Sequence, residues 1–149
     1  MKKIFQFRVK ENTELLDAII KVAVDNKIHS AVILSGVGAL SKAVCRNLKW
    51  FPKEYPVKDE DRLFYQIEQP LELLSLSGWI ASKKDSEAVE VHAHFSASTI
   101  EEGKVVSIGG HLTKGTVTGI KVVVALVILD KDNFYADFDM NTKSIDLFC

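Results

Sequence analysis

The sequence contains few cysteines and no long apolar run, and each shortage excludes a class of protein. Its two cysteines, Cys45 and Cys149, are far apart and form no CxxC pair, so we expect neither a disulfide framework nor a thiolate metal site. The longest candidate for a membrane segment, Ile120–Leu129, is about half the roughly 20 residues that a membrane helix needs. We therefore expect no membrane partner. Because Gln6 and Arg8 interrupt the apolar start of the chain, we also expect no signal peptide and a cytoplasmic location.

An excess of positive charge is missing as well. The 19 basic and 20 acidic residues give a net charge of −1, whereas a protein that binds nucleic acid through bulk electrostatics is usually clearly basic. A nucleotide fingerprint is also missing, because the glycine pair Gly36 and Gly38 is followed by Ser41 where GxGxxG requires glycine. No nucleotide cofactor is therefore expected. The 149 residues, 47% of them hydrophobic, suit one domain over residues 1–149 with a sizeable core.

Hydrophobic periodicity predicts mostly strands. Leucines, isoleucines and alanines at helical spacing predict one amphipathic helix that follows Glu11–Glu14 and ends near Asn26. Alternating or continuous apolar segments predict the strands, at residues 4–9, 30–34, 43–50, 63–67, 71–80, 89–96, 105–111, 116–129 and 134–138, with a further edge strand in the tail. The fold class is α+β, with a largely antiparallel sheet of about seven or more strands and one main helix.

Three details of this scheme are specific enough to test. Ser35–Gly38 is predicted as a tight turn between strands, and Glu68–Pro70 as a break between two more. Asp130–Asn133 is predicted as a turn before the last strands. Val122–Leu129 is an unbroken apolar run, which is typical of a strand buried on both faces, at the centre of a sheet or at a subunit interface.

Three of the four histidines lie in two neighbouring segments. In Val89–Ser96, apolar residues alternate with Glu90, His92, His94 and Ser96, so both histidines face one side of a strand at a spacing of about 7 Å. His111 follows the pair Gly109-Gly110, which either lets the backbone bulge toward the other two histidines or forms an ordinary turn. Three imidazoles with an open fourth position can hold zinc or another divalent ion. The alternative is a polar sheet face without a ligand.

Acidic and hydroxyl side chains near these histidines are candidates to orient the imidazole rings. Glu90 and Ser96 share the polar face of the histidine strand, and Glu72 is a third candidate unless it pairs with Arg8. No nucleophile–base pair is apparent in the sequence, so enzyme activity stays open rather than predicted.

Basic residues gather in two places and are the candidates for nucleic-acid contact. Within 42–53 no acid interrupts the basic residues, and a second pair lies in the predicted hairpin tip 82–87; the candidates are Lys42, Arg46, Lys49, Lys53, Lys83 and Lys84. On a continuous strand Lys42 and Arg46 would share one face, and Lys49 and Lys53 the opposite one. The alternative is a solvated sheet edge.

Several motifs taken together resemble a known family. They are Glu72-Leu73-Leu74-Ser75-Leu76-Ser77-Gly78, His92-Ala93-His94, Gly103, Gly109-Gly110-His111-Leu112 and Gly115-Thr116-Val117. In this order and spacing they resemble the PPC (plants and prokaryotes conserved) domain family, which includes plant AT-hook nuclear-localised proteins. The resemblance runs from Arg8 to Leu129.

The resemblance implies an antiparallel sheet packed by one helix, assembly as a homotrimer, and a metal site at the three matching histidines. Prokaryotic members are commonly described as predicted DNA-binding proteins, so the resemblance implies a DNA-binding or regulatory role. An Arg-Gly-Arg-Pro element of the AT-hook type is missing from the sequence, and Lys121 stands where relatives often carry an acid. The alternative is a metal-dependent enzyme or a small-ligand-binding trimer that uses the same histidines.

Overall fold

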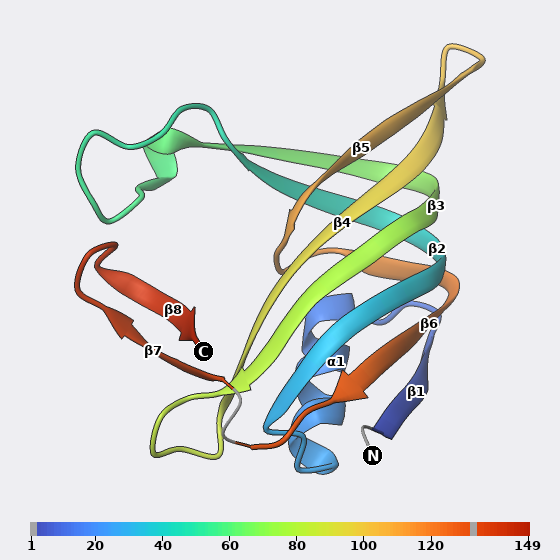
Figure 1. Ribbon diagram of the computed structural model, residues 1–149. Coiled ribbons are helices and arrows are strands. Elements are labelled where there is room, and N and C mark those ends of the chain that lie inside the picture. The colour runs from blue at the N-terminus through green and yellow to red at the C-terminus, as the bar shows by residue number, and fades with distance from the viewer. Residues whose placement is uncertain (1–2, 132–133) are drawn as a thin grey trace.

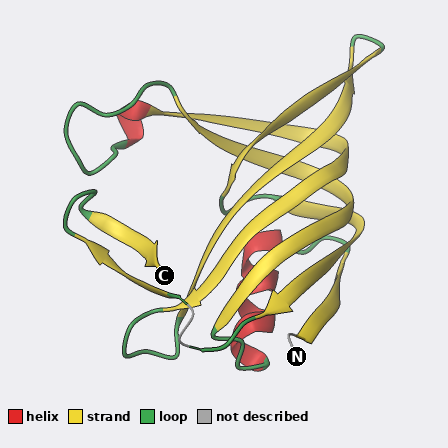
Figure 2. Ribbon diagram, viewed as in Figure 1, coloured by secondary structure: helices red, strands yellow, loops and turns green. Residues whose placement is uncertain are grey.

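A curved, antiparallel sheet wrapped around one helix dominates the computed structural model (Figure 2). The structure describes residues 3–131 and 134–149, and within these ranges the chain forms eight β-strands, one α-helix and a short 3-10 helix. The predicted α+β class is confirmed. Two parts of the predictions, residues 1–2 at the chain start and 132–133 in the predicted turn, lie outside the described residues.

The elements follow one another along the chain with few long connections. Their bounds are β1 (Lys3–Lys10), α1 (Leu15–Asp25), β2 (Ser30–Leu48), η1 (Asp59–Asp61), β3 (Arg62–Ser82), β4 (Val89–Glu101), β5 (Lys104–Leu112), β6 (Val117–Ile128), β7 (Tyr135–Asp139) and β8 (Ser144–Phe148). No helix in the described part of the chain is long and apolar enough to cross a membrane.

The main sheet has the strand order β1-β6-β2-β3-β4-β5, and all its pairings are antiparallel (Figure 1). β2 is long enough for its second half to leave β6 and meet the end of β5, which curls the sheet back on itself. Helix α1 packs behind the sheet through Leu15, Ile19 and Ala23, which are fully buried. The apolar core therefore lies between the helix and one face of the sheet, and the other face is left open.

The predicted turn at Ser35–Gly38 is wrong, because β2 runs through it without reversing. The pairing of β2 with β6 instead shifts register between Ile33 and Ser35 and again between Gly38 and Leu40. Gly38 has a φ of +153°, and a Cβ there would lie 1.9 Å from the carbonyl oxygen of Lys121. The glycine thus permits a bulge and a close strand approach rather than a turn.

The predicted break at Glu68–Pro70 is wrong for a related reason. β3 is continuous from Arg62 to Ser82. Leu71 pairs with Leu40 and Glu68 pairs with Lys42, so β3 carries one more residue than β2 between these two pairs. Pro70 lies within this irregularity, where the missing backbone N–H removes no regular ladder hydrogen bond.

The apolar run of β6 is buried on one face of the sheet only. Val122, Val124 and Leu126 are fully buried against the core, whereas Val123, between them, is exposed on the open face. β6 does lie inside the sheet, between β1 and β2, but burial on both faces within the chain is wrong. The alternative of a subunit interface on the open face stays a prediction.

The last residues form a separate hairpin, β7–β8, beside the open face of the sheet (Figure 1). Phe134 and Ala136 are buried against Ala81, and the ring of Phe134 meets the ring of Trp79 edge-on at 5.3 Å. The predicted edge strand in the tail therefore exists as β8, but it pairs with β7 and not with the main sheet.

Candidate metal centre

Two adjacent strands bring the three predicted histidines together on the open face of the sheet. His92 and His94 alternate with the buried residues of β4, and His111 on β5 lies directly opposite His94 in the ladder. The ring centroids are 5.4 Å apart for His92 and His94, 4.8 Å for His92 and His111, and 5.4 Å for His94 and His111. One ring nitrogen from each histidine lies within 4.8 Å of the other two.

The glycine pair before His111 acts through close approach, and both predicted roles, a bulge and a turn, are wrong. β5 pairs with β4 in unbroken register through Gly109 and Gly110. A Cβ on Gly109 would lie 2.4 Å from the carbonyl oxygen of Phe95 on β4, and one on Gly110 would lie 2.8 Å from the carbonyl oxygen of Arg46 on β2. The pair therefore lets β5 fit between β4 and the second half of β2, which places His111 beside the other histidines.

The surroundings keep two of the imidazoles neutral. Burial lowers the pKa of His111 to about 3, and the positive charge of Arg46 is the next cause. Burial also lowers the pKa of His92, with His94 acting in the same direction and the carboxylate of Asp146 against it. Both rings are therefore neutral near pH 7, and the neutral imidazole is the form that binds a metal ion.

The three residues predicted to orient the imidazoles have other contacts. Glu90 forms an ion pair with Lys83 at 3.6 Å, although its charge still acts on His92. The hydroxyl of Ser96 shares a 2.7 Å hydrogen bond with the hydroxyl of Ser75. Glu72 lies opposite Ser98 and lines a different groove. Of the three, Glu90 is the one whose charge acts on a histidine.

The predicted nucleic-acid candidates do not form one surface. Three form ion pairs with carboxylates: Lys42 with Glu68 at 3.3 Å, Lys83 with Glu90 at 3.6 Å, and Lys84 with Asp137 at 3.6 Å. Lys49 and Lys53 lie in the loop after β2, where the amine of Lys49 is 5.4 Å from the centre of the Trp50 ring. Arg46 lies opposite His111, at the histidine cluster.

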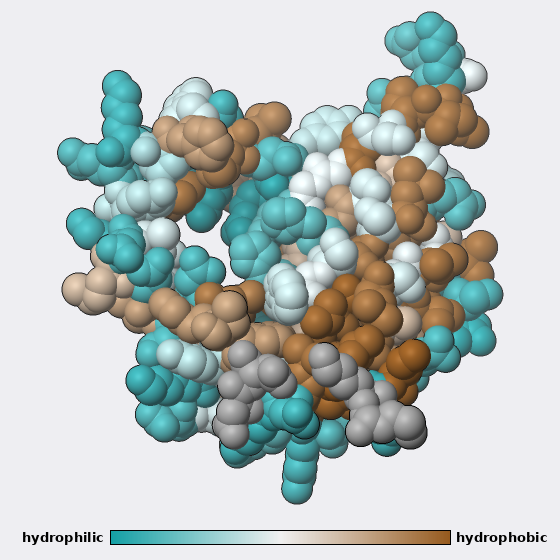
Figure 3. Space-filling view, in the orientation of Figure 1, coloured by the Kyte–Doolittle hydropathy of each residue, from teal (hydrophilic) through white to brown (hydrophobic). Residues whose placement is uncertain are grey.

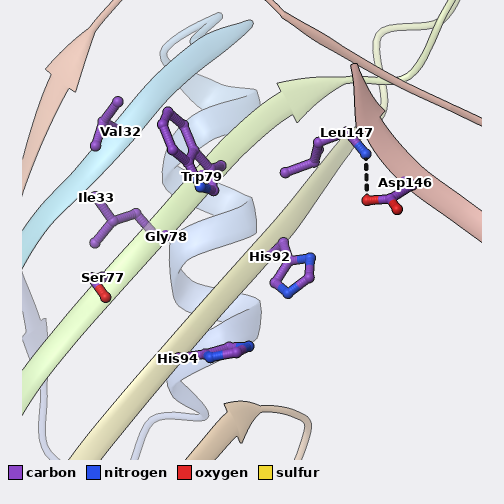
Figure 4. Close-up of a pocket in the computed structure, with 9 residues that line it drawn as sticks. All are labelled: Val32, Ile33, Ser77, Gly78, Trp79, His92, His94, Asp146 and Leu147. Carbon is purple, nitrogen blue, oxygen red and sulfur yellow. Dashed lines mark hydrogen bonds between the residues drawn. The ribbon is translucent and has the colours of Figure 1, made fainter. Parts of the chain in front are cut away.

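A cavity of about 540 Å³ opens in front of His92 and His94, and the sequence does not predict all of its lining. Its walls are Val32, Ile33, Ser77, Gly78, Trp79, His92, His94, Asp146 and Leu147 (Figure 4). Asp146 and Leu147 come from β8, so the docked hairpin closes one side of the cavity. The sequence carries no signal for this contact, because Asp146 approaches His92 only once the hairpin docks on the sheet, where Phe134 and Ala136 pack against Trp79 and Ala81.

The donor set fits a divalent ion. A tetrahedral zinc site with Zn–N distances of 2.0–2.1 Å requires nitrogen atoms roughly 3.3–3.4 Å apart. Because the three ligand atoms already lie within 4.8 Å of one another, modest ring rotations would bring them onto one ion. Three neutral imidazoles suit zinc and neighbouring divalent metals, and they leave a fourth position toward solvent.

Comparisons with known proteins identify relatives of the whole chain. Residues 1–130 match the Plants and Prokaryotes Conserved (PCC) domain. A metal-containing protein from Archaeoglobus fulgidus is 27% identical over 98% of this chain and 93% of its own, with a TM-score of 0.73. A plant- and prokaryote-conserved protein from Pyrococcus horikoshii is 27% identical over 97% of this chain and 93% of its own, with a TM-score of 0.70.

A third structure shows the fold alone. It is a protein from Bacteroides thetaiotaomicron described as a DNA-binding candidate, and it is 16% identical over 99% of this chain and 96% of its own, with a TM-score of 0.74. Among curated proteins, none matches the chain.

Proposed function

Because the chain belongs to the Plants and Prokaryotes Conserved domain family, we propose that it is a metal-binding member whose His92, His94 and His111 hold one divalent ion. The observation that carries the proposal is the set of three ring nitrogens within 4.8 Å, drawn from two strands, with His92 and His94 lining a cavity. Zinc is the first choice because imidazole nitrogens suit it. The name of the Archaeoglobus relative, a metal-containing protein, supports the same assignment.

The open position of the ion is proposed to face a small ligand. When bound, a divalent ion supplies Lewis-acid polarisation of an oxygen atom of that ligand. The histidines hold the ion, Trp79 supplies an apolar wall, and Asp146 supplies a carboxylate on the side of the hairpin. The same arrangement serves a ligand-binding protein or a metal-dependent enzyme, and turnover of the ligand distinguishes the two.

Metal analysis of protein purified without chelators tests the site. We expect about one zinc per chain in the wild-type protein and none in a His92→Ala/His94→Ala variant. His29→Ala is the matched control, because His29 lies outside the cluster and its Nδ1 shares a 2.9 Å hydrogen bond with the hydroxyl of Ser82. The absence of metal from the wild-type protein, or its retention in the double variant, would contradict the proposal.

Regulatory DNA binding is the second candidate, and the description of the Bacteroides structure favours it. The net charge of −1 does not favour it, and the ion pairs of Lys42, Lys83 and Lys84 leave Arg46, Lys49 and Lys53 of the six basic candidates. Any binding would then be weak and salt-sensitive, through the loop that carries Lys49 and Lys53.

Duplex titrations at low and moderate salt test the DNA role. If it is correct, Lys42→Ala/Lys49→Ala/Lys53→Ala weakens binding. The negative slope of log K against log salt also becomes shallower, by up to about 0.9 for each phosphate that these lysines neutralise. Undetectable binding at low salt, or an unchanged slope in the variant, rejects this candidate.

We further propose that the protein is a cytoplasmic homotrimer. Apolar side chains gather on the open face of the sheet over β2, β3 and β6 (Figure 3), and those exposed there include Leu34, Val37, Leu74 and Val123. A second copy would remove this patch from water. Two free cysteines, Cys45 and Cys149, suit a reducing compartment. Sedimentation equilibrium should give three times the chain mass, and a monodisperse monomer would contradict the assembly.

A further inference from the structure

The second half of β2 places an arginine beside the histidine cluster. Arg46 is directly opposite His111 in the short β2–β5 ladder, and the next pair in that ladder is Cys45 with Leu112. Directly opposed residues of an antiparallel pair point to the same face of the sheet. Cys45 and Leu112 are both buried in the core, so Arg46 and His111 share the opposite face, where the other histidines lie.

Arg46 has no counterion of its own among the described residues. None of the ion pairs of the described chain includes it, whereas the neighbouring Arg62 pairs with Asp59 at 3.6 Å. The side chain of Arg46 is half-buried. Burial lowers its pKa and the charge of Arg62 lowers it further, with Asp59 acting in the opposite direction. A partly desolvated guanidinium without a carboxylate is an unfavourable arrangement that a bound anion would relieve.

Negative charge lies at the opposite end of the site. Asp146, from β8, lines the cavity beside His92, whereas Arg46 adjoins His111. Figure 1 shows the arm formed by β2 and β3 and the C-terminal hairpin on two sides of the site, and Figure 3 shows hydrophilic residues along the hollow between them. The site is therefore polarised, with a cation on the side of the arm and a carboxylate on the side of the hairpin.

We propose that this site binds a small molecule with an oxyanion group, a carboxylate or a phosphate, which the guanidinium of Arg46 holds beside the metal position. This inference rests on the proposed metal centre and adds the ligand class. Arginine presents paired N–H donors that match two oxygen atoms of either group, and such charge-assisted bonds are among the strongest in proteins. Asp146 repels a second negative charge and accepts a hydrogen bond from a hydroxyl or amine, so it fixes the direction in which the ligand lies. The adjacent cavity of about 540 Å³, lined by His92, His94 and Asp146, suits a small molecule. Arg46 is not part of this lining and lies beside it, opposite His111.

Calorimetric titration of zinc-loaded protein with lactate and with inorganic phosphate tests the proposal and separates the two oxyanions. We expect one of them to bind with 1:1 stoichiometry, and Arg46→Gln to weaken that binding by about tenfold or more. Arg46→Lys, which keeps the charge without the paired donors, should show an intermediate loss. Arg8→Gln is the control, because Arg8 is exposed on β1 and lies away from the site.

Zinc content is measured on every variant, so that a failure of the proposed metal centre is distinguished from a failure of the proposed oxyanion ligand. Equal anion affinity in wild-type and Arg46→Gln protein, each with one zinc per chain, overturns the ligand assignment and leaves the metal centre intact. The ligand assignment is also overturned if neither anion binds to zinc-loaded wild-type protein. It is overturned likewise if duplex DNA binds in an Arg46-dependent manner and neither anion binds. If the wild-type protein takes up no zinc, the proposed function fails, and the same titrations on metal-free protein decide whether Arg46 binds an oxyanion.

Discussion

The histidine cluster and the basic stretch 42–53 differ in how the fold treats residues of one chemical kind. His94 and His111 are 17 positions apart in the sequence, yet the β4–β5 ladder makes them direct neighbours. Lys42, Arg46, Lys49 and Lys53 are close in sequence, yet one pairs with Glu68, one adjoins His111 and two lie in a loop. Strand pairing therefore brings distant histidines together, whereas proximity in sequence alone does not create a charged surface.

The largest effect expected from this comparison is the loss of metal affinity in His111→Ala. His111 supplies one of three ligands and lies on a different strand from the other two. Substituting even an outer partner of a metal ligand typically costs 10–100-fold in affinity, so we expect a loss of about 100-fold or more here. Competition with a chromophoric chelator measures it. Lys42→Ala/Lys49→Ala/Lys53→Ala should stay within about twofold of the wild-type affinity. Similar losses in both variants would remove the distinction between the two regions.

Alternation in the sequence was enough to predict the central part of the site. The pattern of Val89–Ser96 assigns His92 and His94 to one face of a strand, and β4 confirms that assignment. The convergence of His111 on the pair is confirmed too, although its cause is the close packing of Gly109 and Gly110 and not a bulge or turn. The single helix and the mainly antiparallel sheet follow from the same periodicities.

What the sequence could not predict depends on contacts between distant segments. Gly38 and Pro70 are typical turn and breaker residues, and only their partner strands show that both lie at irregularities inside long strands. Asp146 has no pattern that relates it to a histidine, because its place depends on how the hairpin docks. Charge patterning follows the sequence and so groups Arg46 with the neighbouring lysines, whereas the β2–β5 pairing groups it with His111.

Gly78→Ala tests whether the histidine strand depends on close packing with β3. Gly78 is opposite Ala93, and a Cβ there would lie 2.2 Å from the carbonyl oxygen of His92. We expect the free energy of unfolding to fall by about 1–3 kcal/mol, as for other overpacked sites, and zinc affinity to fall with it. Urea denaturation and the chelator assay measure the two effects.

Gly103→Ala is the matched control for this substitution. Gly103 has a φ of +75° in the turn between β4 and β5, and a Cβ there would have no neighbour within 4 Å. It should cost about 1 kcal/mol through backbone strain alone and leave zinc affinity unchanged. Zinc affinity that falls equally in both variants would show that close packing at Gly78 does not position the site.

Phe134→Ala tests the docking of the hairpin, with a smaller effect. The edge-on contact of Phe134 with Trp79 anchors β7–β8 beside the cavity, and aromatic pairs of this kind contribute about 0.5–1.5 kcal/mol beyond their buried area. We expect faster amide exchange in residues 135–148 and little change in the main sheet. Zinc affinity should change by less than about tenfold, because the ligands lie on β4 and β5.

Tyr135→Ala is the control for the hairpin, since the exposed ring of Tyr135 stacks on Phe148 within the hairpin and not on the sheet. Exchange that stays slow in Phe134→Ala, or that accelerates equally in both variants, would show that another contact holds the hairpin in place.

The smallest effect is expected from Asp61→Asn, which tests the loop that carries Lys49 and Lys53. The Asp61 carboxylate accepts hydrogen bonds from the backbone N–H of Lys58 at 2.9 Å and from Trp50 Nε1 at 2.8 Å. The bond from Lys58 is the main cause that lowers the pKa of Asp61, and the bond from Trp50 adds to it. Since the folded-state pKa lies below the unfolded one, the folded protein binds fewer protons in the interval between them. The stabilisation is therefore complete above the unfolded pKa of about 3.9 and is lost as the pH falls through the folded value.

Urea midpoints measured from pH 6 down to pH 2 should fall less steeply in Asp61→Asn than in the wild-type protein, because the substituted side chain does not titrate. Glu54→Gln removes an exposed carboxylate from the same loop and should preserve the wild-type slope. Equal slopes in all three proteins would show that the carboxylate of Asp61 does not stabilise the loop. A reduced slope in Asp61→Asn alone would show that one buried carboxylate stabilises the folded loop that carries Lys49 and Lys53. The histidines, in contrast, are positioned by the ladders of the main sheet.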